Sequence, residues 1–203
     1  MKILVSPRIE YFESINEERI SLDIRWYKFL EFCGYEIEIF DYTNKNLDAF
    51  NGVILTGGND LSSINPSKQN IKRDNFERRL VKFAINKNIP LLGICRGAQL
   101  LAHIYNSKLV SVKNHVQVKH KLINKNRSNL LGFKLEQDRV NSYHNYGIVN
   151  LGGSLEPLAF CEDETIEAFE HIHHKILGLI WHPERNNSWQ KHDVELIKKF
   201  FSL

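Results

Sequence analysis

The stretch PLLGICRGAQ, residues 90–99, decides what the rest of the chain can form. Its apolar run after a proline indicates a short buried strand that ends at Cys95, and residues 96–105 have the apolar spacing of a helix. Gly93 and Gly97 flank the cysteine, as a tight strand-to-helix turn with a strained nucleophile at its tip requires. Such a turn points the helix N-terminus at the sulfur, which favours the reactive thiolate. The alternative is that Cys95 is only a small buried hydrophobe, as most free cysteines are.

A second short apolar run, ILGLI at residues 176–180, leads directly into WHPE at residues 181–184. A histidine at a strand end with a carboxylate two residues later can supply a base and the group that orients it. The chain therefore contains a nucleophile, a base and an orienting carboxylate.

The blocks GICRGxQ and WHPE resemble the two signature blocks of the class I glutamine amidotransferases, in the expected order and over nearly the whole chain. This resemblance implies an α/β, flavodoxin-like fold: a mostly parallel central sheet flanked by helices, with a small antiparallel β addition. It implies that Cys95 is the nucleophile, His182 the general base and acid, and Glu184 the residue that orients His182. The amides of Gly58 and Arg96 would then form the oxyanion hole.

Substrate-binding residues are expected from the same resemblance, and they are Gly57, Gln99, Ser142, Tyr143 and His144. Gln99 lies one helical turn after the cysteine, and the matching glutamine in the family contacts the γ-glutamyl group. The last three belong to an NSYH block similar to the one that holds the amino-acid head group. A solvated loop is the alternative for this block, and a simple turn is the alternative for the glycine pair.

An arginine follows the nucleophile, where glutaminase subunits that pass ammonia to a synthase usually have an aliphatic residue. Cys-Arg-Gly looks more like the γ-glutamyl-amide hydrolase branch, exemplified by γ-glutamyl-γ-aminobutyrate hydrolases. Arg73, Asp74 and Glu77 also resemble an RDxxE pattern of that branch, although they could equally be surface charges at helical spacing. The loop after Gly58, NDLSSINP, matches the hydrolases only in part.

The resemblance implies a hydrolase that cleaves a γ-glutamyl amide through a thioester, with no metal or organic cofactor. Lys119 and Lys121 lie in a basic segment, residues 113–127, that could receive an anionic leaving group such as that of γ-glutamyl-CDP-amidate in capsule phosphoramidate synthesis. A solvated charged strand edge is the alternative. A glutaminase subunit that delivers ammonia to a separate synthase is the second hypothesis, and a non-enzymatic module is the third. The expected partner is a small-molecule γ-glutamyl substrate, with a homodimer left open.

Composition and cysteine content limit the number of domains, the class of protein and its cellular compartment. The 203 residues are 42% hydrophobic and 25% charged with a net charge of +3, which predicts one globular domain over residues 1–203 and gives no indication of nucleic acid. The first seven residues are too short and too quickly polar for a signal peptide, and no apolar run reaches about 18 residues. Together with three scattered cysteines, these features lead us to expect a cytoplasmic protein. Cys33 and Cys161 are expected to be structural. The tract of His171, His173 and His174 lacks a matching set of further metal ligands.

Strands and helices alternate in the first half of the chain, which predicts a parallel sheet with its site at the carboxyl ends of the strands. The expected strands are residues 2–6, 36–42, 52–58 and 90–95, and the expected helices are 17–33, 75–87 and 96–105. Ile20, Ile24, Tyr27 and either Leu30 or Phe32 would form the buried face of the first helix, with Gly34 after its end. Antiparallel additions are expected at 109–112, 115–123, 133–140, 155–161 and 166–171, and a closing helix at 187–201.

Overall fold

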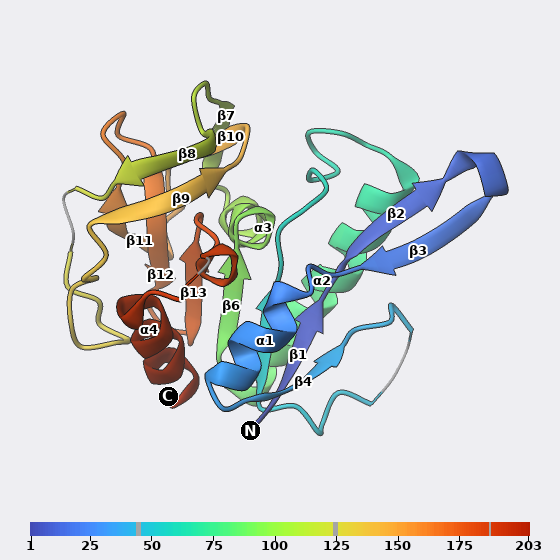
Figure 1. Ribbon diagram of the computed structural model, residues 1–203, viewed down its shortest axis with the longest axis horizontal. Helices are drawn as coiled ribbons and strands as arrows, with labels where there is room; N and C mark the ends of the chain where they lie inside the picture. Colours follow the sequence, from blue (N-terminus) through green and yellow to red (C-terminus); the bar gives the residue numbers. More distant parts are fainter. Residues whose placement is uncertain (44–45, 124–125, 187) are drawn as a thin grey trace.

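The computed structural model describes residues 1–43, 46–123, 126–186 and 188–203, and its centre is one large twisted sheet (Figure 1). Within the described ranges, nine strands form this sheet in the order β4-β1-β5-β6-β13-β12-β10-β7, with β11 paired to β12 outside that path. They are β1 (Lys2–Ser6), β4 (Glu36–Ile39), β5 (Gly52–Leu55), β6 (Leu91–Ile94), β7 (Lys108–Ser111), β10 (Tyr146–Asn150), β11 (Leu155–Phe160), β12 (Ile166–His171) and β13 (Ile176–Leu179). The strands from β4 to β13 in this order are parallel, and the remaining pairs are antiparallel. The predicted fold class is confirmed.

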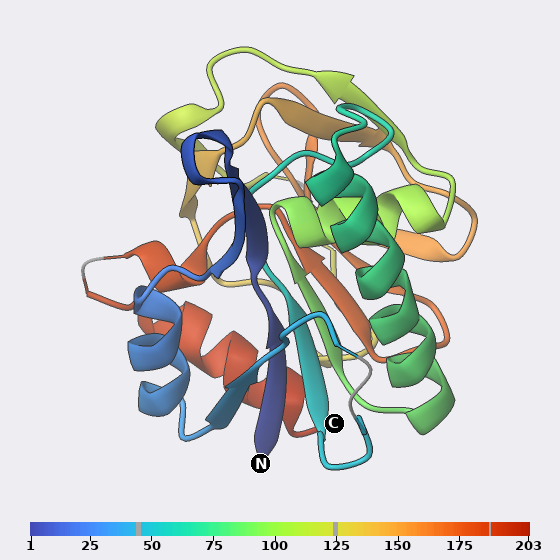
Figure 2. The same cartoon turned by 90° about the vertical axis from the view of Figure 1, so that its right-hand side faces the viewer.

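Helices cover both faces of the sheet, as Figure 2 shows from the side. Helices α1 (Arg25–Phe32) and α4 (Lys191–Phe201) share one hydrophobic core with the sheet, while α2 (Lys68–Lys87) and α3 (Arg96–Ile104) share the other. Because the parallel strands are covered on both sides, β5, β6 and β13 are buried at every position and are apolar throughout. Apolar runs without alternation were therefore a sound signal for the strands that carry the site.

Two antiparallel ribbons stand at the end of the sheet where the parallel strands finish (Figure 1). One is β2 (Arg8–Phe12) with β3 (Glu17–Ser21), and the other is β8 (Val116–Lys121) with β9 (Arg139–Tyr143). They bring chain segments from both halves of the sequence to the edge of the sheet where an α/β protein places its site.

The predicted helix over residues 17–33 is wrong in its first half. Residues 17–21 form β3, because residues 8–12, which we did not predict as a strand, offer them an antiparallel partner. The helix begins only at Arg25, after Asp23, whose carboxylate accepts a hydrogen bond from the Arg25 amide at 3.0 Å. Of the predicted apolar face only Leu30 is buried, and Trp26 and Phe29 join it, whereas Ile20, Ile24, Tyr27 and Phe32 are exposed.

Other boundaries shift as well. Of the predicted strand 133–140, only residues 139–140 belong to a strand, and they begin β9. This strand continues through residues 141–143, so these residues do not form the solvated loop that was the alternative for them. Strand β10 was not predicted. Helix α2 begins at Lys68 rather than at residue 75, and α4 begins at Lys191. Asn187, the predicted start of α4, and Lys125 of the basic segment lie outside the described residues.

Candidate active site

Cys95 occupies the tip of a sharp turn between β6 and α3. Its backbone lies in an unusual region, with φ 50° and ψ −106°, and its amide donates to the Leu179 carbonyl of the neighbouring strand at 2.8 Å. Gly97 permits the turn, since a Cβ atom there would lie 2.0 Å from the Leu55 carbonyl oxygen. A strained residue held by packing at a helix N-terminus is the arrangement expected for an activated nucleophile.

His182 and Glu184 follow β13, the parallel neighbour of β6, so adjacent strand ends deliver the cysteine and the histidine. The His182 Nδ1 atom lies 2.7 Å from the Glu184 carboxylate. Asn141 on β9 fixes the histidine main chain from both sides: its Oδ1 accepts from the His182 amide at 2.8 Å, and its Nδ2 donates to the His182 carbonyl at 2.7 Å. The imidazole is thereby oriented with its Nε2 available to the thiol.

The electrostatics of this pair favour a thiolate and an imidazolium. Burial raises the pKa of the Cys95 thiol, but the charge of His182 and a hydrogen bond with it outweigh burial, so the pKa lies below its ordinary value. Burial lowers the pKa of His182, but Glu184 and the Cys95 sulfur raise it to about 9. By contrast, burial raises the pKa of Cys33 and Cys161 to about 11, which leaves both as unreactive thiols.

The loop after β5 passes beside this pair, and buried Arg73 of α2 holds it in place. The Arg73 guanidinium donates to the Thr56 carbonyl at 2.8 Å, to the Gly57 carbonyl at 3.2 Å and to the Gly58 carbonyl. In a planar trans peptide the N–H points opposite to the carbonyl, so binding the Gly57 oxygen also fixes the direction of the Gly58 N–H. Gly58 has φ +80°, a conformation that glycine adopts without strain.

The RDxxE residues, Arg73, Asp74 and Glu77, are buried next to the turn that carries Cys95 and Arg96, and they are not surface charges. Glu77 accepts from Arg73 at 2.8 Å and also pairs with Arg96, which forms a second ion pair with Asp74. All four side chains are almost completely inaccessible to solvent. The pattern could be seen in the sequence, but the role of Arg73 in holding the glycine loop could not, because it depends on how α2 packs against β5.

A pocket of about 240 Å³ opens beside His182 and Glu184. Gly57, Gly58, His182, Glu184 and Trp26 contribute to its wall, together with two cations that we did not predict, Arg8 and Arg185. The Arg185 guanidinium stacks over the Tyr143 ring at 4.7 Å. Arg8 belongs to β2, so finding it required the ribbon that the sequence did not reveal.

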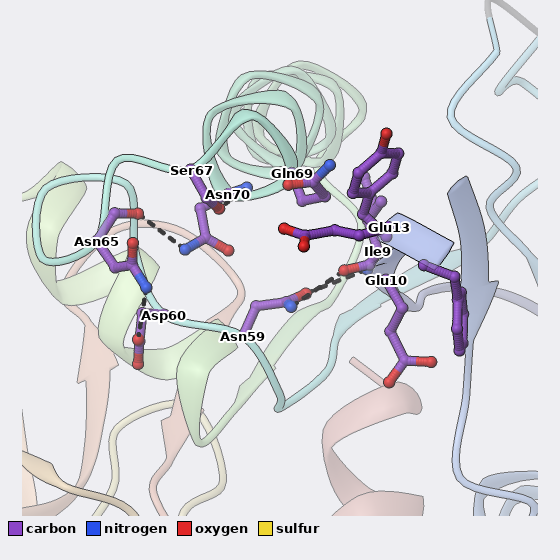
Figure 3. Close-up of a pocket in the computed structure, with 11 residues that line it drawn as sticks. Ile9, Glu10, Glu13, Asn59, Asp60, Asn65, Ser67, Gln69 and Asn70 are labelled. Atoms are coloured by element: carbon purple, nitrogen blue, oxygen red, sulfur yellow. Dashed lines mark hydrogen bonds between the residues drawn. The ribbon is translucent and has the colours of Figure 1, made fainter. Parts of the chain in front are cut away.

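A larger and more open pocket of about 630 Å³ lies beyond Ile9 and Asn59, lined by Glu10, Glu13, Asp60 and several amides (Figure 3). It contains none of the predicted catalytic residues. Asn59 exchanges two hydrogen bonds of 3.1 Å with the Ile9 main chain there, which ties the glycine loop to β2. These two hydrogen bonds hold the glycine loop from outside the candidate active site, and the pocket, which among the described residues has carboxylates but no lysine or arginine in its lining, disfavours an anionic ligand.

The predicted substrate-binding side chains of Gln99, Ser142 and Tyr143 differ in whether they are free to contact a ligand. Gln99 donates its amide to the Tyr146 carbonyl at 2.8 Å, and the buried Ser142 hydroxyl donates to the His115 carbonyl at 2.7 Å. Tyr143 is 37% exposed and its ring lies 5.8 Å from that of His182, edge to face. Of these side chains, that of Tyr143 is the most open to a ligand.

The structure does not bring Lys119 and Lys121 to the catalytic pocket. Both side chains are exposed on β8, and Lys119 lines a separate depression with Glu136, Gln137 and Asn186. The histidines of the same segment point inward instead. Among the described residues, His115, His120 and Glu167 could hold a metal ion, as could the exposed set of Glu136, His192 and Glu195.

The tract of His171, His173 and His174 forms no such group in the part of the chain that the structure describes. His171 is buried, and its Nδ1 accepts from the amides of His173 and His174 at 2.9 and 3.1 Å. In the same part of the chain, none of the helices is both long and apolar enough to cross a membrane.

Residues 38–184 match the peptidase C26 family. The γ-glutamyl-CDP-amidate hydrolase of Campylobacter jejuni is 37% identical over 213 aligned positions, covering 100% of this chain and 98% of that protein. A glutamine-hydrolysing GMP synthase subunit of Methanococcus vannielii is 28% identical over 73% of this chain and 71% of its own length.

Solved structures of low identity share the fold. A GMP synthase subunit-like protein from Thermoplasma acidophilum superimposes with a TM-score of 0.75 at 21% identity, covering 100% of this chain and 92% of its own. A glutamine amidotransferase from Thermotoga maritima gives 0.65 at 20% identity, covering 97% and 82%. With the family match over most of the chain and a full-length hydrolase relative, this chain belongs to the peptidase C26 family of class I glutamine amidotransferase-like proteins and is a hydrolase that acts on an amide bond.

Proposed function

We propose that the chain hydrolyses the amide bond of a γ-glutamyl compound through a γ-glutamyl thioester on Cys95. The observation that carries the proposal is the assembly of Cys95, His182 and Glu184 at two adjacent strand ends, in a chain similar over its full length to a γ-glutamyl-CDP-amidate hydrolase. The lowered pKa of Cys95 and the raised pKa of His182 supply the thiolate and the acid that such chemistry needs.

In this mechanism the Cys95 thiolate attacks the γ-carbonyl carbon, and the carbonyl oxygen becomes an oxyanion. The amides of Gly58 and Arg96 donate to this oxyanion, and His182 gives its proton to the departing nitrogen as the C–N bond breaks. His182 then takes a proton from water, the hydroxide attacks the thioester carbon, and glutamate leaves as the thiolate re-forms. Arg73 supports the scheme by fixing the direction of the Gly58 N–H.

We place the leaving group at Arg8 and Arg185, not at the lysines of β8. Both arginines line the pocket over His182, and Arg185 is close enough to contribute to the lowered pKa of the Cys95 thiol. Guanidinium groups bind phosphate oxygens through two parallel hydrogen bonds. This position suits a nucleoside diphosphate amidate, and γ-glutamyl-CDP-amidate is the candidate substrate.

The test measures glutamate release by the purified chain from glutamine, γ-glutamyl-γ-aminobutyrate and a γ-glutamyl nucleotide amidate. We expect strong turnover of the nucleotide amidate, none in Cys95→Ala, and a covalent γ-glutamyl adduct by mass spectrometry when hydrolysis is slowed. Arg185→Ala should raise KM for the nucleotide amidate at least tenfold and leave that for glutamine unchanged. Lys119→Ala is the matched control, and an effect confined to Lys119→Ala would overturn the assignment of the leaving-group site.

A glutaminase that serves a separate synthase is the second candidate, favoured by the likeness to the glutamine-hydrolysing GMP synthase subunit of Methanococcus vannielii. It predicts slow hydrolysis of glutamine alone and acceleration by a synthase chain. Rapid hydrolysis of one amide by the isolated chain would exclude it.

A further inference from the structure

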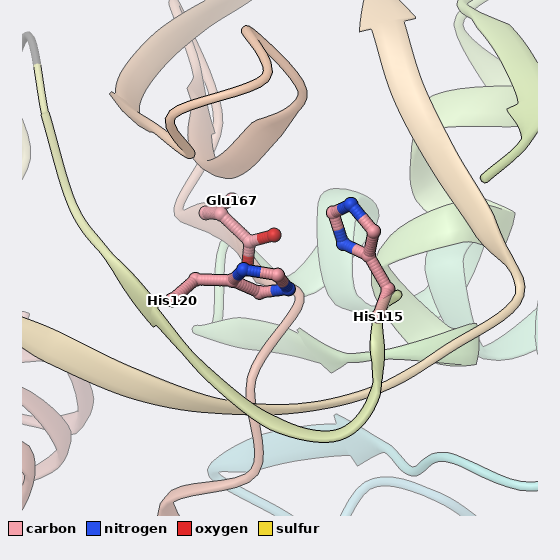
Figure 4. Close-up of side chains that lie close together, drawn as sticks. All are labelled: His115, His120 and Glu167. Carbon is pink, nitrogen blue, oxygen red and sulfur yellow. The ribbon is translucent and has the colours of Figure 1, made fainter. Parts of the chain in front are cut away.

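Four side chains to which the mechanism above assigns no step gather behind the β8–β9 ribbon. They are His115 just before β8, His120 within it, His144 just after β9, and Glu167 on β12. Figure 4 shows His115 and His120 reaching from one segment toward the carboxylate of Glu167. One nitrogen from each of these two histidines and one oxygen of Glu167 lie within 4.8 Å of one another.

The atoms that face one another in this cluster have no hydrogen-bond partner among the described residues. They are His115 Nδ1, His120 Nε2, His144 Nε2 and both carboxylate oxygens of Glu167. Glu167 is completely buried, and the distance from its Oε1 to His144 Nε2 is 3.5 Å. A buried carboxylate with no donor at hydrogen-bond distance is costly, so a cation there is favourable, either the protonated His144 ring or a bound metal ion.

The outward nitrogens of two of these histidines are already engaged. His115 Nε2 lies 2.7 Å from the Asp163 carboxylate, and His144 Nδ1 lies 2.9 Å from the Tyr146 carbonyl oxygen. Because these oxygens only accept, each outward nitrogen carries a proton, so it is the inward nitrogen that a neutral ring would offer to a metal ion. Metal-binding histidines show this pattern, in which a carboxylate or carbonyl holds the nitrogen that does not bind the metal.

We propose that His115, His120 and Glu167, with His144 as a fourth ligand, form a binding site for a zinc-type divalent cation. Imidazole nitrogens with one carboxylate suit Zn²⁺ better than Mg²⁺ or Ca²⁺, which prefer oxygen ligands. Ligand atoms around tetrahedral zinc lie about 3.3 Å apart, given bonds of about 2.0–2.1 Å. Modest side-chain rotations would therefore close the present spacing around the ion.

The role of the cation is to position the β8–β9 ribbon. It would tie β8 to β12, and the main-chain carbonyl of the ligand His115 accepts the hydrogen bond from Ser142 on β9. The ribbon also carries Tyr143, which contacts His182, and Asn141, which holds the His182 main chain. The ion is thus a structural support of the substrate side of the pocket, and it takes no part in bond breaking.

Zinc binding is measured on full-length Cys95→Ala protein, because a thiolate beside an imidazole can itself bind zinc. Equilibrium dialysis with elemental analysis should give one Zn²⁺ per chain, and Co²⁺ in its place should show the intense visible bands of a four-coordinate site. Glu167→Gln should weaken binding at least 100-fold, and Asp163→Asn should weaken it by about 10- to 100-fold. His192→Ala, which disrupts the exposed Glu136 and Glu195 set, is the matched control and should bind normally.

The zinc-binding measurements need no substrate, so their results test the metal site independently of the proposed reaction. Loss of zinc in Glu167→Gln but not in His192→Ala, with a thermal midpoint raised by zinc only where the ion binds, supports the site. Substoichiometric zinc, or binding unchanged by Glu167→Gln in a folded protein, overturns it. The cluster would then be an imidazolium–carboxylate pair between His144 and Glu167.

Discussion

Arg73→Lys tests whether the direction of a single main-chain amide limits catalysis. The Arg73 guanidinium binds the carbonyls of Thr56, Gly57 and Gly58 at once. A lysine ammonium is a compact point charge and cannot donate to all three carbonyls in this geometry. The Gly57–Gly58 peptide would lose the bond that sets its orientation. The positive charge beside Glu77 would remain, so the change separates geometry from charge.

The size of the expected loss in kcat follows from the contribution of the Gly58 N–H to the oxyanion hole. Complete loss of one such donor costs about 2.7–4 kcal/mol of transition-state stabilisation, or about 10²–10³ in kcat. Lysine can still reach one carbonyl, so we expect a partial loss of about 10- to 100-fold, equivalent to about 1.4–2.7 kcal/mol. Since the oxyanion exists only in the transition state, kcat and kcat/KM should fall together while KM stays nearly constant.

The assay is glutamate release at saturating and limiting substrate, on protein whose folding is checked by urea denaturation. Arg79→Lys makes the same substitution at an exposed position of the same helix and should change nothing beyond about 0.5 kcal/mol. A folded Arg73→Lys enzyme with wild-type kcat would refute the reasoning, and so would a change confined to KM.

The remaining predictions concern pH, steric fit and the buried charges. Activity should rise as the nucleophilic thiol loses its proton below pH 9 and fall as His182 loses its proton near pH 9, because the departing nitrogen then lacks an acid. Glu184→Gln removes the carboxylate that raises the pKa of His182, so the alkaline limb of the pH–rate profile should move to lower pH. Gly57→Ala places a Cβ atom 2.7 Å from His182 Cε1 and should reduce kcat about 100-fold, whereas Gly153→Ala, with open space around it, should not. Arg96→Leu leaves the buried Asp74 carboxylate without its arginine partner and Glu77 with Arg73 alone, so it should lower the free energy of unfolding in urea by about 3–5 kcal/mol, while the main-chain amide of residue 96 still serves the oxyanion.

Part of this molecule follows from local sequence. An apolar run bounded by Pro90 and Gly97 favours a buried strand followed by a tight turn, and the run before His182 likewise favours a strand, so the parallel strands that carry Cys95 and His182 at their ends were predictable. Helix α3 was predictable for a similar reason, since its apolar spacing repeats within a few residues. These signals are short in range and do not depend on distant partners.

Tertiary structure decided the rest, because the partners lie far apart in the chain. Residues 17–21 became a strand only because β2 pairs with them, which overrode their helical spacing and brought Arg8 to the pocket. Whether Arg73 was a surface charge or the support of the glycine loop depended on the packing of α2 against β5. His115 and His120 share no local sequence pattern with Glu167, because they belong to the β8–β9 ribbon and its approach while Glu167 lies on β12 of the large sheet. Sequence fixes a residue's chemistry and local conformation, whereas burial and long-range contacts decide what that chemistry can do.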